Sequence, residues 1–151
     1  MAKQKAIQIA DRSMSFVVVS NRLPVDRSFD KQGNAQWSMS PGGLVTALGP
    51  VMNAQGGAWV GWPGQPDEQV DAFEWENYSV VPVELSGQDI EEFYEGMSNS
   101  TIWPLYHDCI VNPEFHREWW DAYERVNQRF ADEVIRITAD DGIVWVQDYQ
   151  L

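Results

Sequence analysis

An uninterrupted apolar run over residues 16–19, which Ser20 ends, constrains the fold most strongly. It contains three consecutive valines and has no polar face, so a strand of this composition must be covered on both sides, as in a parallel sheet flanked by helices. A second run of this kind occupies residues 143–146. Both are far shorter than the roughly 20 apolar residues that a membrane-spanning helix needs. We therefore expect an α/β domain with a mainly parallel sheet.

The remaining elements alternate between strand and helix. The strands that we expect are residues 16–20, 58–62, 78–83 and 143–146. Helices are expected after Gly42-Gly43 and after the capping box formed by Ser86 and Asp89. The longest helix should begin at Asn112-Pro113 and end at Ile137, since apolar residues recur there at helical spacing. The segments read as loops, turns or a short hairpin are residues 26–40, 98–104 and 140–142.

The eight tryptophans divide into two groups. The four that lie in apolar patterns, and that we place in the core, are Trp59, Trp75, Trp119 and Trp145. Trp62 and Trp103 lie beside Pro or Gly at the ends of elements, where an indole face suits either a sugar ring or protein packing. We interpret the single cysteine, Cys109, as a small buried residue, because no Cys/His spacing typical of a metal site accompanies it.

The charge distribution excludes whole classes of partner. The net charge is −13, and no lysine or arginine lies between Lys31 and Arg117. Nucleic acid and anionic membrane surfaces require a cationic stripe, so neither is expected as a partner. The amino-terminal residues include no apolar stretch typical of a secretory signal, and we expect a cytoplasmic protein.

Three short features could bind a small anion or a sugar. Arg22, at the carboxyl end of the first strand, suits a phosphate, although an ordinary surface arginine is the alternative. Asp148, after the last strand, suits sugar hydroxyls or the N-cap of a following helix. Gly42 and Gly43 open a helix whose backbone amides can approach a phosphate or sugar oxygen, or they form a tight turn.

Six segments taken in order resemble the trehalose-6-phosphate synthases (glycosyltransferase family 20). These segments are residues 17–24, 42–44, 57–62, Tyr94 with 98–104, 119–127 and 144–151. The resemblance covers residues 15–151 and implies the GT-B fold, which has two Rossmann-like domains. Residues 1–14 would be a flexible extension and residues 15–151 the first part of the acceptor-side domain. The carboxyl-terminal donor-binding domain would be absent from this chain.

The resemblance also implies a reaction and a set of binding residues. The family transfers glucose, with retention of configuration, from UDP-glucose to glucose 6-phosphate, giving trehalose 6-phosphate and UDP. Acceptor-binding positions would be Arg22, Trp62 (or Trp59), Tyr94, Trp103 and Asp148, and donor-binding positions Gly42 and Gly43. The chain would contain no catalytic residue, metal or cofactor site, and would be inactive alone.

One departure and several alternatives accompany this resemblance. Gln147 and Gln150 stand where many members carry histidines, so a role for those histidines cannot be transferred to this chain. The alternatives are a related transferase with another phosphorylated acceptor, such as glycerol 3-phosphate, and a non-catalytic phosphosugar-binding module. The donor nucleotide and a homo-oligomeric state of the full-length protein are left open.

Overall fold

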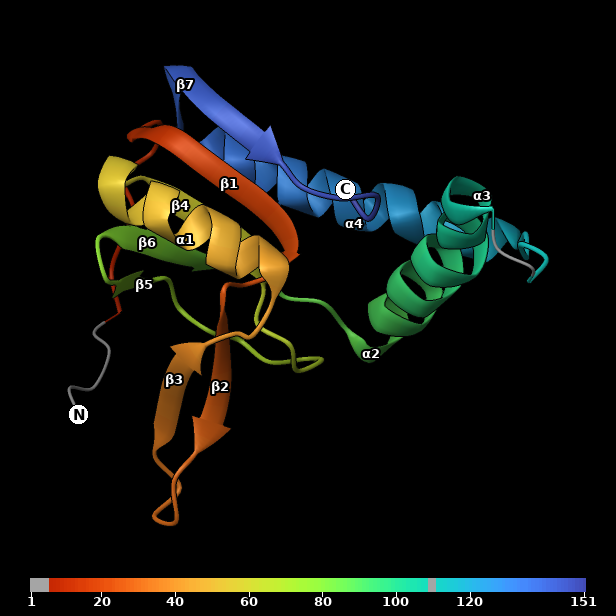
Figure 1. The fold of residues 1–151 in the computed structure, drawn as a ribbon, viewed down its shortest axis with the longest axis horizontal. Helices are drawn as coiled ribbons and strands as arrows, with labels where there is room; N and C mark the ends of the chain where they lie inside the picture. The colour runs from red at the N-terminus through yellow and green to blue at the C-terminus, as the bar shows by residue number, and fades with distance from the viewer. Residues whose placement is uncertain (1–5, 109–110) are drawn as a thin grey trace.

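A five-stranded sheet with the order β5-β6-β4-β1-β7 forms the centre of the computed structural model, which describes residues 6–108 and 111–151 (Figure 1). Its parallel strands are β1 (Met14–Arg22), β4 (Ala58–Trp62), β6 (Tyr78–Pro82) and β7 (Thr138–Val146). The short strand β5 (Phe73–Trp75) pairs antiparallel with β6. The mainly parallel α/β sheet expected from the sequence is confirmed.

Two helices cover opposite faces of this sheet (Figure 1). Helix α1 (Gly43–Gln55) packs Leu48 and Met52 against Val18, whereas α4 (Arg117–Ile137) packs Val126 against Val17. Successive side chains of a strand point to opposite faces, so the valine run of β1 supplies both layers of the core. Burial on both faces is thereby confirmed for Val17, Val18 and Val19, whereas Phe16 is half-buried.

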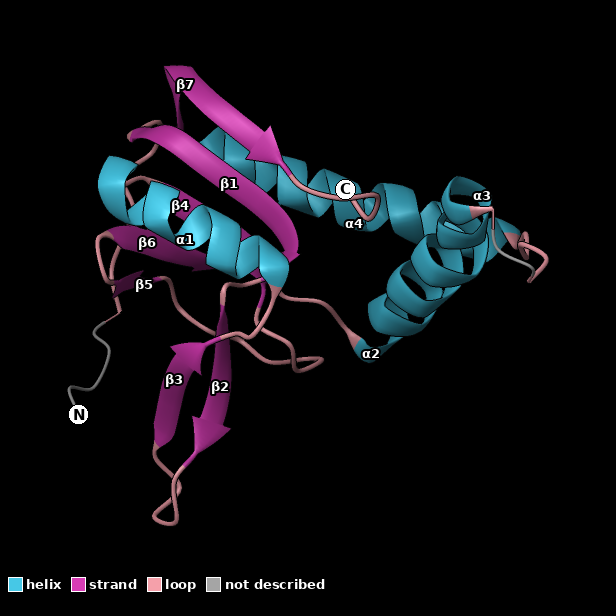
Figure 2. Ribbon diagram, viewed as in Figure 1, coloured by secondary structure: helices cyan, strands magenta, loops and turns pink. Residues whose placement is uncertain are grey.

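A hairpin and a helical arm extend from the sheet, as the secondary-structure colouring makes clear (Figure 2). The hairpin comprises β2 (Val25–Phe29) and β3 (Ala35–Met39). The arm comprises α2 (Gly87–Asp89), the π-helical segment η1 (Ile90–Ile102) and α3 (Trp103–His107). The predicted capping box is confirmed, because the Ser86 side chain accepts from the Asp89 N–H and Asp89 Oδ2 accepts from the Ser86 N–H, both over 3.0 Å.

Two expectations for the helical regions are wrong. Residues 98–104 continue the helical arm instead of turning, because the Ser98 and Ser100 hydroxyls each donate over 2.8 Å to the carbonyl five residues earlier. The long helix begins at Arg117 rather than at Asn112-Pro113. Glu114 keeps this segment out of the helix, since its N–H donates to the Ser100 carbonyl and its own carbonyl accepts from Thr101.

The last strand and its tryptophan also differ from expectation. Trp145 is 46% exposed and Ile143 65% exposed, because β7 is an edge strand that pairs only with β1 among the described strands. Trp59 is fully buried as predicted, whereas Trp75 and Trp119 are half-buried. The turn expected at residues 140–142 is not present as a separate element. These residues lie within β7, at the point where its register with β1 shifts.

Residues 6–13, expected to form part of a flexible extension, contact the domain in two places. The Ile7 N–H donates to the Ala72 carbonyl and the Arg12 N–H to the Arg136 carbonyl, each over 2.8 Å. Cys109 and residues 1–5 lie outside the described residues. Within residues 6–108 and 111–151, no helix combines the length and the apolar character that a membrane span requires.

Candidate functional site

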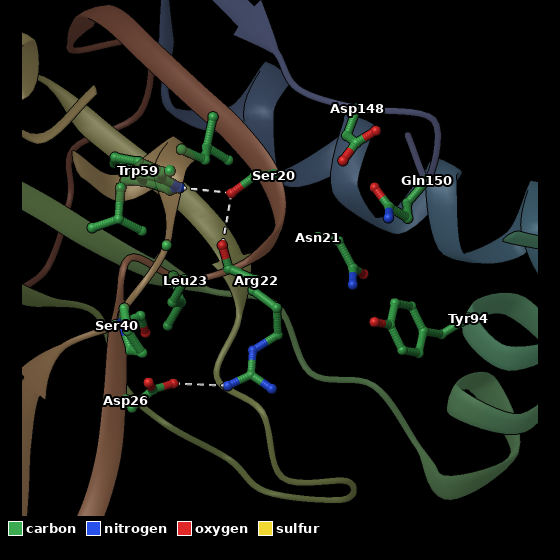
Figure 3. A pocket seen from close by; sticks show the side chains of 15 residues that line it. Ser20, Asn21, Arg22, Leu23, Asp26, Ser40, Trp59, Tyr94, Asp148 and Gln150 are labelled. Atoms are coloured by element: carbon green, nitrogen blue, oxygen red, sulfur yellow. Dashed lines mark hydrogen bonds and ion pairs between the residues drawn. The ribbon is translucent and has the colours of Figure 1, made fainter. Parts of the chain in front are cut away.

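The end of β1 is distorted by a bulge that aims polar side chains into a cleft. Between Val19 and Arg22, three steps along β1 lie opposite two steps along β4. The Ser20 Oγ donates to the Arg22 carbonyl over 2.7 Å and accepts from the Trp59 Nε1 over 2.8 Å (Figure 3). Neighbouring residues of a regular strand point to opposite faces, but a bulge re-aims them. Asn21 and Arg22 therefore both line the same cleft.

Two glycines allow the backbone and Arg22 to take these positions. A Cβ on Gly61 would lie 2.7 Å from the Leu23 nitrogen, so β4 can approach the bulge only at a glycine. Gly64 has a φ of +104°, and a Cβ there would lie 2.6 Å from the Arg22 Cζ. The loop after β4 thus packs directly against the Arg22 guanidinium.

The cleft has a volume of about 410 Å³, which is within the range of small-molecule sites. It lies beyond the carboxyl ends of β1 and β7, where the chain connections diverge to opposite sides of β1. Ligands of open α/β sheets bind at such switch points. The side chains and backbone that line it come from β1, β2, the loop before α1, the first turn of α1, β4, η1 and the segment after β7.

Arg22 supplies the positive charge of this cleft. It is the only lysine or arginine among the described residues that line it, and its side chain is 46% exposed. The guanidinium forms an ion pair with Asp26 over 2.9 Å, and its Cζ lies 5.0 Å from the centre of the Trp62 ring. Held between a carboxylate, an indole face and Gly64, it is preorganised to contact an anion such as a phosphate.

The first turn of α1 forms the adjacent wall. Gly42 and Gly43 line the cleft, and a Cβ at either position would meet nothing within 4 Å. No side chain caps this helix, and its first turn carries no acidic residue. The first amides of a helix have no partner within the helix and carry partial positive charge, so this end can accept an anionic or sugar oxygen.

The segment after β7 brings Asp148 to the cleft opposite α1. Helix α4 fixes this segment, because the Tyr123 hydroxyl donates to the Tyr149 carbonyl over 3.0 Å and the Asn127 Nδ2 to the Gln150 carbonyl over 3.1 Å. The Tyr149 hydroxyl donates over 2.7 Å to Asn99 Oδ1. Burial, assisted by the charge of Asp148, raises the pKa of Tyr149, so this hydroxyl remains a donor at neutral pH.

Five of the seven predicted site residues line this one cleft: Arg22, Gly42, Gly43, Tyr94 and Asp148 (Figure 3). Trp62 and Trp103 are not among the lining residues. Trp62 is 6% exposed, not open as its Gly–Pro context indicated, because it belongs to the buried cluster on the α4 face of the sheet, and Arg22 also packs against its ring. Trp103 stacks on His107 with ring centres 3.3 Å apart and lies 5.2 Å from the Tyr149 ring. Trp59, the alternative to Trp62, does line the cleft.

Five polar residues that line the cleft were not among the predicted site residues, namely Ser20, Asn21, Asp26, Ser40 and Gln150. Among the described residues of the cleft, Asn21 Oδ1 and Ser40 Oγ are buried and lack a hydrogen-bond partner. A signal was available for Asn21, which directly follows the strand expected at residues 16–20, much as Asp148 comes shortly after the strand expected at residues 143–146. None was available for Ser40, because its position depends on the hairpin. No group of three His, Cys, Asp or Glu side chains in the described part of the chain is arranged to hold a metal ion.

The chain is similar in sequence and in fold to proteins of one known family. The sequence model of glycosyltransferase family 20 matches residues 14–151. A trehalose-6-phosphate synthase of Mycobacterium avium (strain 104) is 56% identical over 140 residues, covering 90% of this chain and 28% of the relative. The chain thus spans less than a third of the length of that relative.

Two solved structures share the fold. One, described as trehalose-6-phosphate from E. coli bound with UDP-2-fluoro glucose, has a TM-score of 0.70 and 32% identity, covering 90% of this chain and 28% of that one. The other is an α,α-trehalose-phosphate synthase from Burkholderia xenovorans in complex with glucose-6-phosphate, with a TM-score of 0.70 and 26% identity. It covers the same shares, 90% and 28%.

Proposed function

Because this chain belongs to glycosyltransferase family 20, we propose that it forms the acceptor side of a retaining glucosyltransferase. The reaction transfers glucose from UDP-glucose to glucose 6-phosphate and gives trehalose 6-phosphate and UDP. The bond from the anomeric carbon to the diphosphate breaks, the anomeric hydroxyl oxygen of glucose 6-phosphate forms the new bond, and the proton of that hydroxyl passes to the leaving UDP or to water. The relatives named as trehalose-6-phosphate synthases support this choice of substrates.

The observation that carries the proposal is the position of Arg22. It is the one cation among the described cleft residues, and Asp26, Trp62 and Gly64 hold its guanidinium at the cleft. A phosphate monoester suits this group, because a guanidinium binds two of its oxygens at once. We assign the acceptor phosphate to Arg22 on this basis.

The other cleft residues take the remaining parts of the two substrates. Tyr94 and Asp148 offer a hydroxyl and a carboxylate to the hydroxyls of the acceptor sugar. The backbone amides at Gly42 and Gly43 face the donor sugar and its phosphate. Trp62 packs its ring against the Arg22 guanidinium and so helps to position it. Trp103 lies beside Tyr149, in the segment that carries Asp148, and acts at the acceptor side through that contact.

The donor diphosphate requires a second source of positive charge. With Arg22 engaged by the acceptor, the described cleft offers no further lysine or arginine to stabilise the leaving UDP. We propose that residues outside this chain supply that charge and that the 151 residues alone do not transfer glucose. Charged sugar phosphates and nucleotide sugars do not cross membranes freely, which favours a cytoplasmic enzyme.

Activity of the protein encoded by the whole reading frame tests the proposal. With UDP-glucose and glucose 6-phosphate, we expect release of UDP and formation of trehalose 6-phosphate, followed by mass spectrometry. Arg22→Ala should lose most of this activity through a raised KM for glucose 6-phosphate. Arg117→Ala is the matched control, because Arg117 pairs with Asp121 on the exposed surface of α4. Preferred transfer to glycerol 3-phosphate, or no transfer to any phosphorylated acceptor, would contradict the proposal.

A further inference from the structure

Asn21 and Ser40 line the cleft with buried, unpaired oxygens that the proposed function leaves unused, and Asn21 is the more buried of the two. Its side chain lines the cleft and is only 6% exposed, and its Oδ1 has no hydrogen-bond partner among the described residues. A buried acceptor without a donor is costly, so proteins rarely retain one without a reason. In Figure 3 the side chain extends from the end of β1 into the space that Arg22, Tyr94 and Gln150 also face.

The bulge of β1 is what places this group. The Ser20 hydroxyl donates a hydrogen bond to the Arg22 carbonyl and accepts one from the Trp59 indole. The residues on either side of Asn21 are therefore linked to each other and to β4. These bonds place the Asn21 backbone without using the polar atoms of its carboxamide. This arrangement is typical of a preorganised contact for a ligand rather than of a structural hydrogen bond.

The neighbours of Asn21 decide which ligand group it suits. A phosphate presents only acceptors at neutral pH, and the carboxylates of Asp26 and Asp148 do the same, so none of them satisfies Oδ1. A sugar hydroxyl does, since it donates to Oδ1 and can also accept from the Nδ2 of the same carboxamide. We propose that Asn21 is a specificity-determining residue that accepts a hydrogen bond from a ring hydroxyl of the phosphosugar whose phosphate Arg22 binds. This inference rests on the proposed function, because it takes the acceptor to be glucose 6-phosphate.

The inference explains how the cleft selects a sugar phosphate over a shorter polyol phosphate. Arg22 contacts only the phosphate that both kinds of molecule share. Asn21 directly precedes Arg22 in the chain, and a hexose phosphate is long enough to contact both side chains. A ligand without the matching hydroxyl leaves the buried Oδ1 unpaired, and sites of this kind reject such ligands strongly.

The test compares acceptors that each lack one hydroxyl, using the protein encoded by the whole reading frame. The acceptors are glucose 6-phosphate and its 2-deoxy, 3-deoxy and 4-deoxy analogues, and the measured quantity is kcat/KM. In the wild type we expect kcat/KM for one of the analogues to be lower than that for glucose 6-phosphate by about tenfold or more. In Asn21→Ala we expect about a tenfold loss with glucose 6-phosphate itself, and no further loss with that one analogue.

Two more variants make the result decisive. Asn21→Ser keeps a polar group at the buried position but is too short to reach the ligand, so it should give the same pattern if the alanine variant does not fold. Asn53→Ala removes an asparagine near the far end of α1, where its side chain accepts a hydrogen bond from the Asn77 N–H, and should keep the wild-type pattern.

The outcomes separate this inference from the proposed function. If the Asn21 variants keep the full deoxy penalties of the wild type, Asn21 does not contact the sugar and the inference is wrong. A wild type that penalises no deoxy analogue also overturns it. If the wild type does not use glucose 6-phosphate at all, the proposed function itself has failed.

Discussion

Gly64→Ala should weaken phosphate binding without touching the ligand. Gly64 has a φ of +104°, and the added Cβ would lie 2.6 Å from the Arg22 Cζ and 2.7 Å from its Nη1. Because the guanidinium is the movable end of a flexible side chain, it shifts away while the backbone of the loop stays. The displaced group loses its place between Asp26 and the Trp62 ring.

Gly64→Ala should change two free energies that can be measured separately, that of unfolding and that of ligand binding. An L-residue with positive φ costs about 1–2 kcal/mol, which corresponds to a fall of about 2–8 °C in Tm for a domain of this size. Loss of a charge-assisted hydrogen bond to phosphate costs about 1.5–3 kcal/mol, which is roughly a 10- to 100-fold increase in the Kd for glucose 6-phosphate. The first part acts on stability and the second on binding.

Gly33→Ala isolates the first part. Gly33 has a φ of +81° in the β2–β3 hairpin, and a Cβ there would meet nothing within 4 Å. Thermal unfolding should show similar Tm losses for the two variants, whereas calorimetric titration with glucose 6-phosphate should show weaker binding only for Gly64→Ala. Equal affinities in the two variants would refute the reasoning that Gly64 positions Arg22.

Three further substitutions test the packing around the site and the core. Ser20→Ala leaves the buried Trp59 Nε1 without an acceptor, and we expect urea titration to show a loss of about 1–3 kcal/mol in unfolding free energy; an unchanged value would contradict the role given to the bulge. Tyr78→Phe should leave the unfolding free energy equal or higher, because burial raises the pKa of Tyr78 to about 12 and its hydroxyl has no partner among the described residues; a clear loss would point to a hydrogen bond. Asp89 is buried, which opposes its ionisation, but hydrogen bonds to the carboxylate outweigh burial and lower its pKa from 3.8 to about 2. Since the folded pKa lies below the unfolded one, the stabilisation of about 2 kcal/mol is complete above pH 3.8 and is lost as the pH falls towards 2. The stability gap between wild type and Asp89→Asn should therefore shrink over that range, and a gap independent of pH would contradict the assignment.

The central sheet was predictable because its strands depend on short-range composition. The valine run of β1 and the apolar residues of β4 are buried on both faces, as their lack of a polar face requires. The capping box at Ser86 is likewise a local contact between residues three positions apart. The pattern that predicts each of these features lies within a short stretch of sequence, although the valines of β1 pack against distant helices.

Features that depend on distant partners could not be predicted. Trp145 has the composition of a core residue, but its exposure follows from the position of β7 at the sheet edge. Trp62 lies in a context typical of an exposed turn, yet it is buried in the core cluster with residues of other strands and helices, and Arg22 packs against its ring. The bulge that aims Asn21 into the cleft depends on the contact between Ser20 and Trp59, which are 39 positions apart.

The central claim is that this chain binds a phosphorylated sugar through Arg22, and a tryptophan-fluorescence titration tests it most directly. The Arg22 Cζ lies 5.0 Å from the Trp62 ring, so an anion on the guanidinium should change the emission of that tryptophan. We predict a saturable change with glucose 6-phosphate, none with glucose, and none in Arg22→Ala. In a sample that circular dichroism shows to be folded, no response to glucose 6-phosphate, or an equal response to glucose, would contradict the claim.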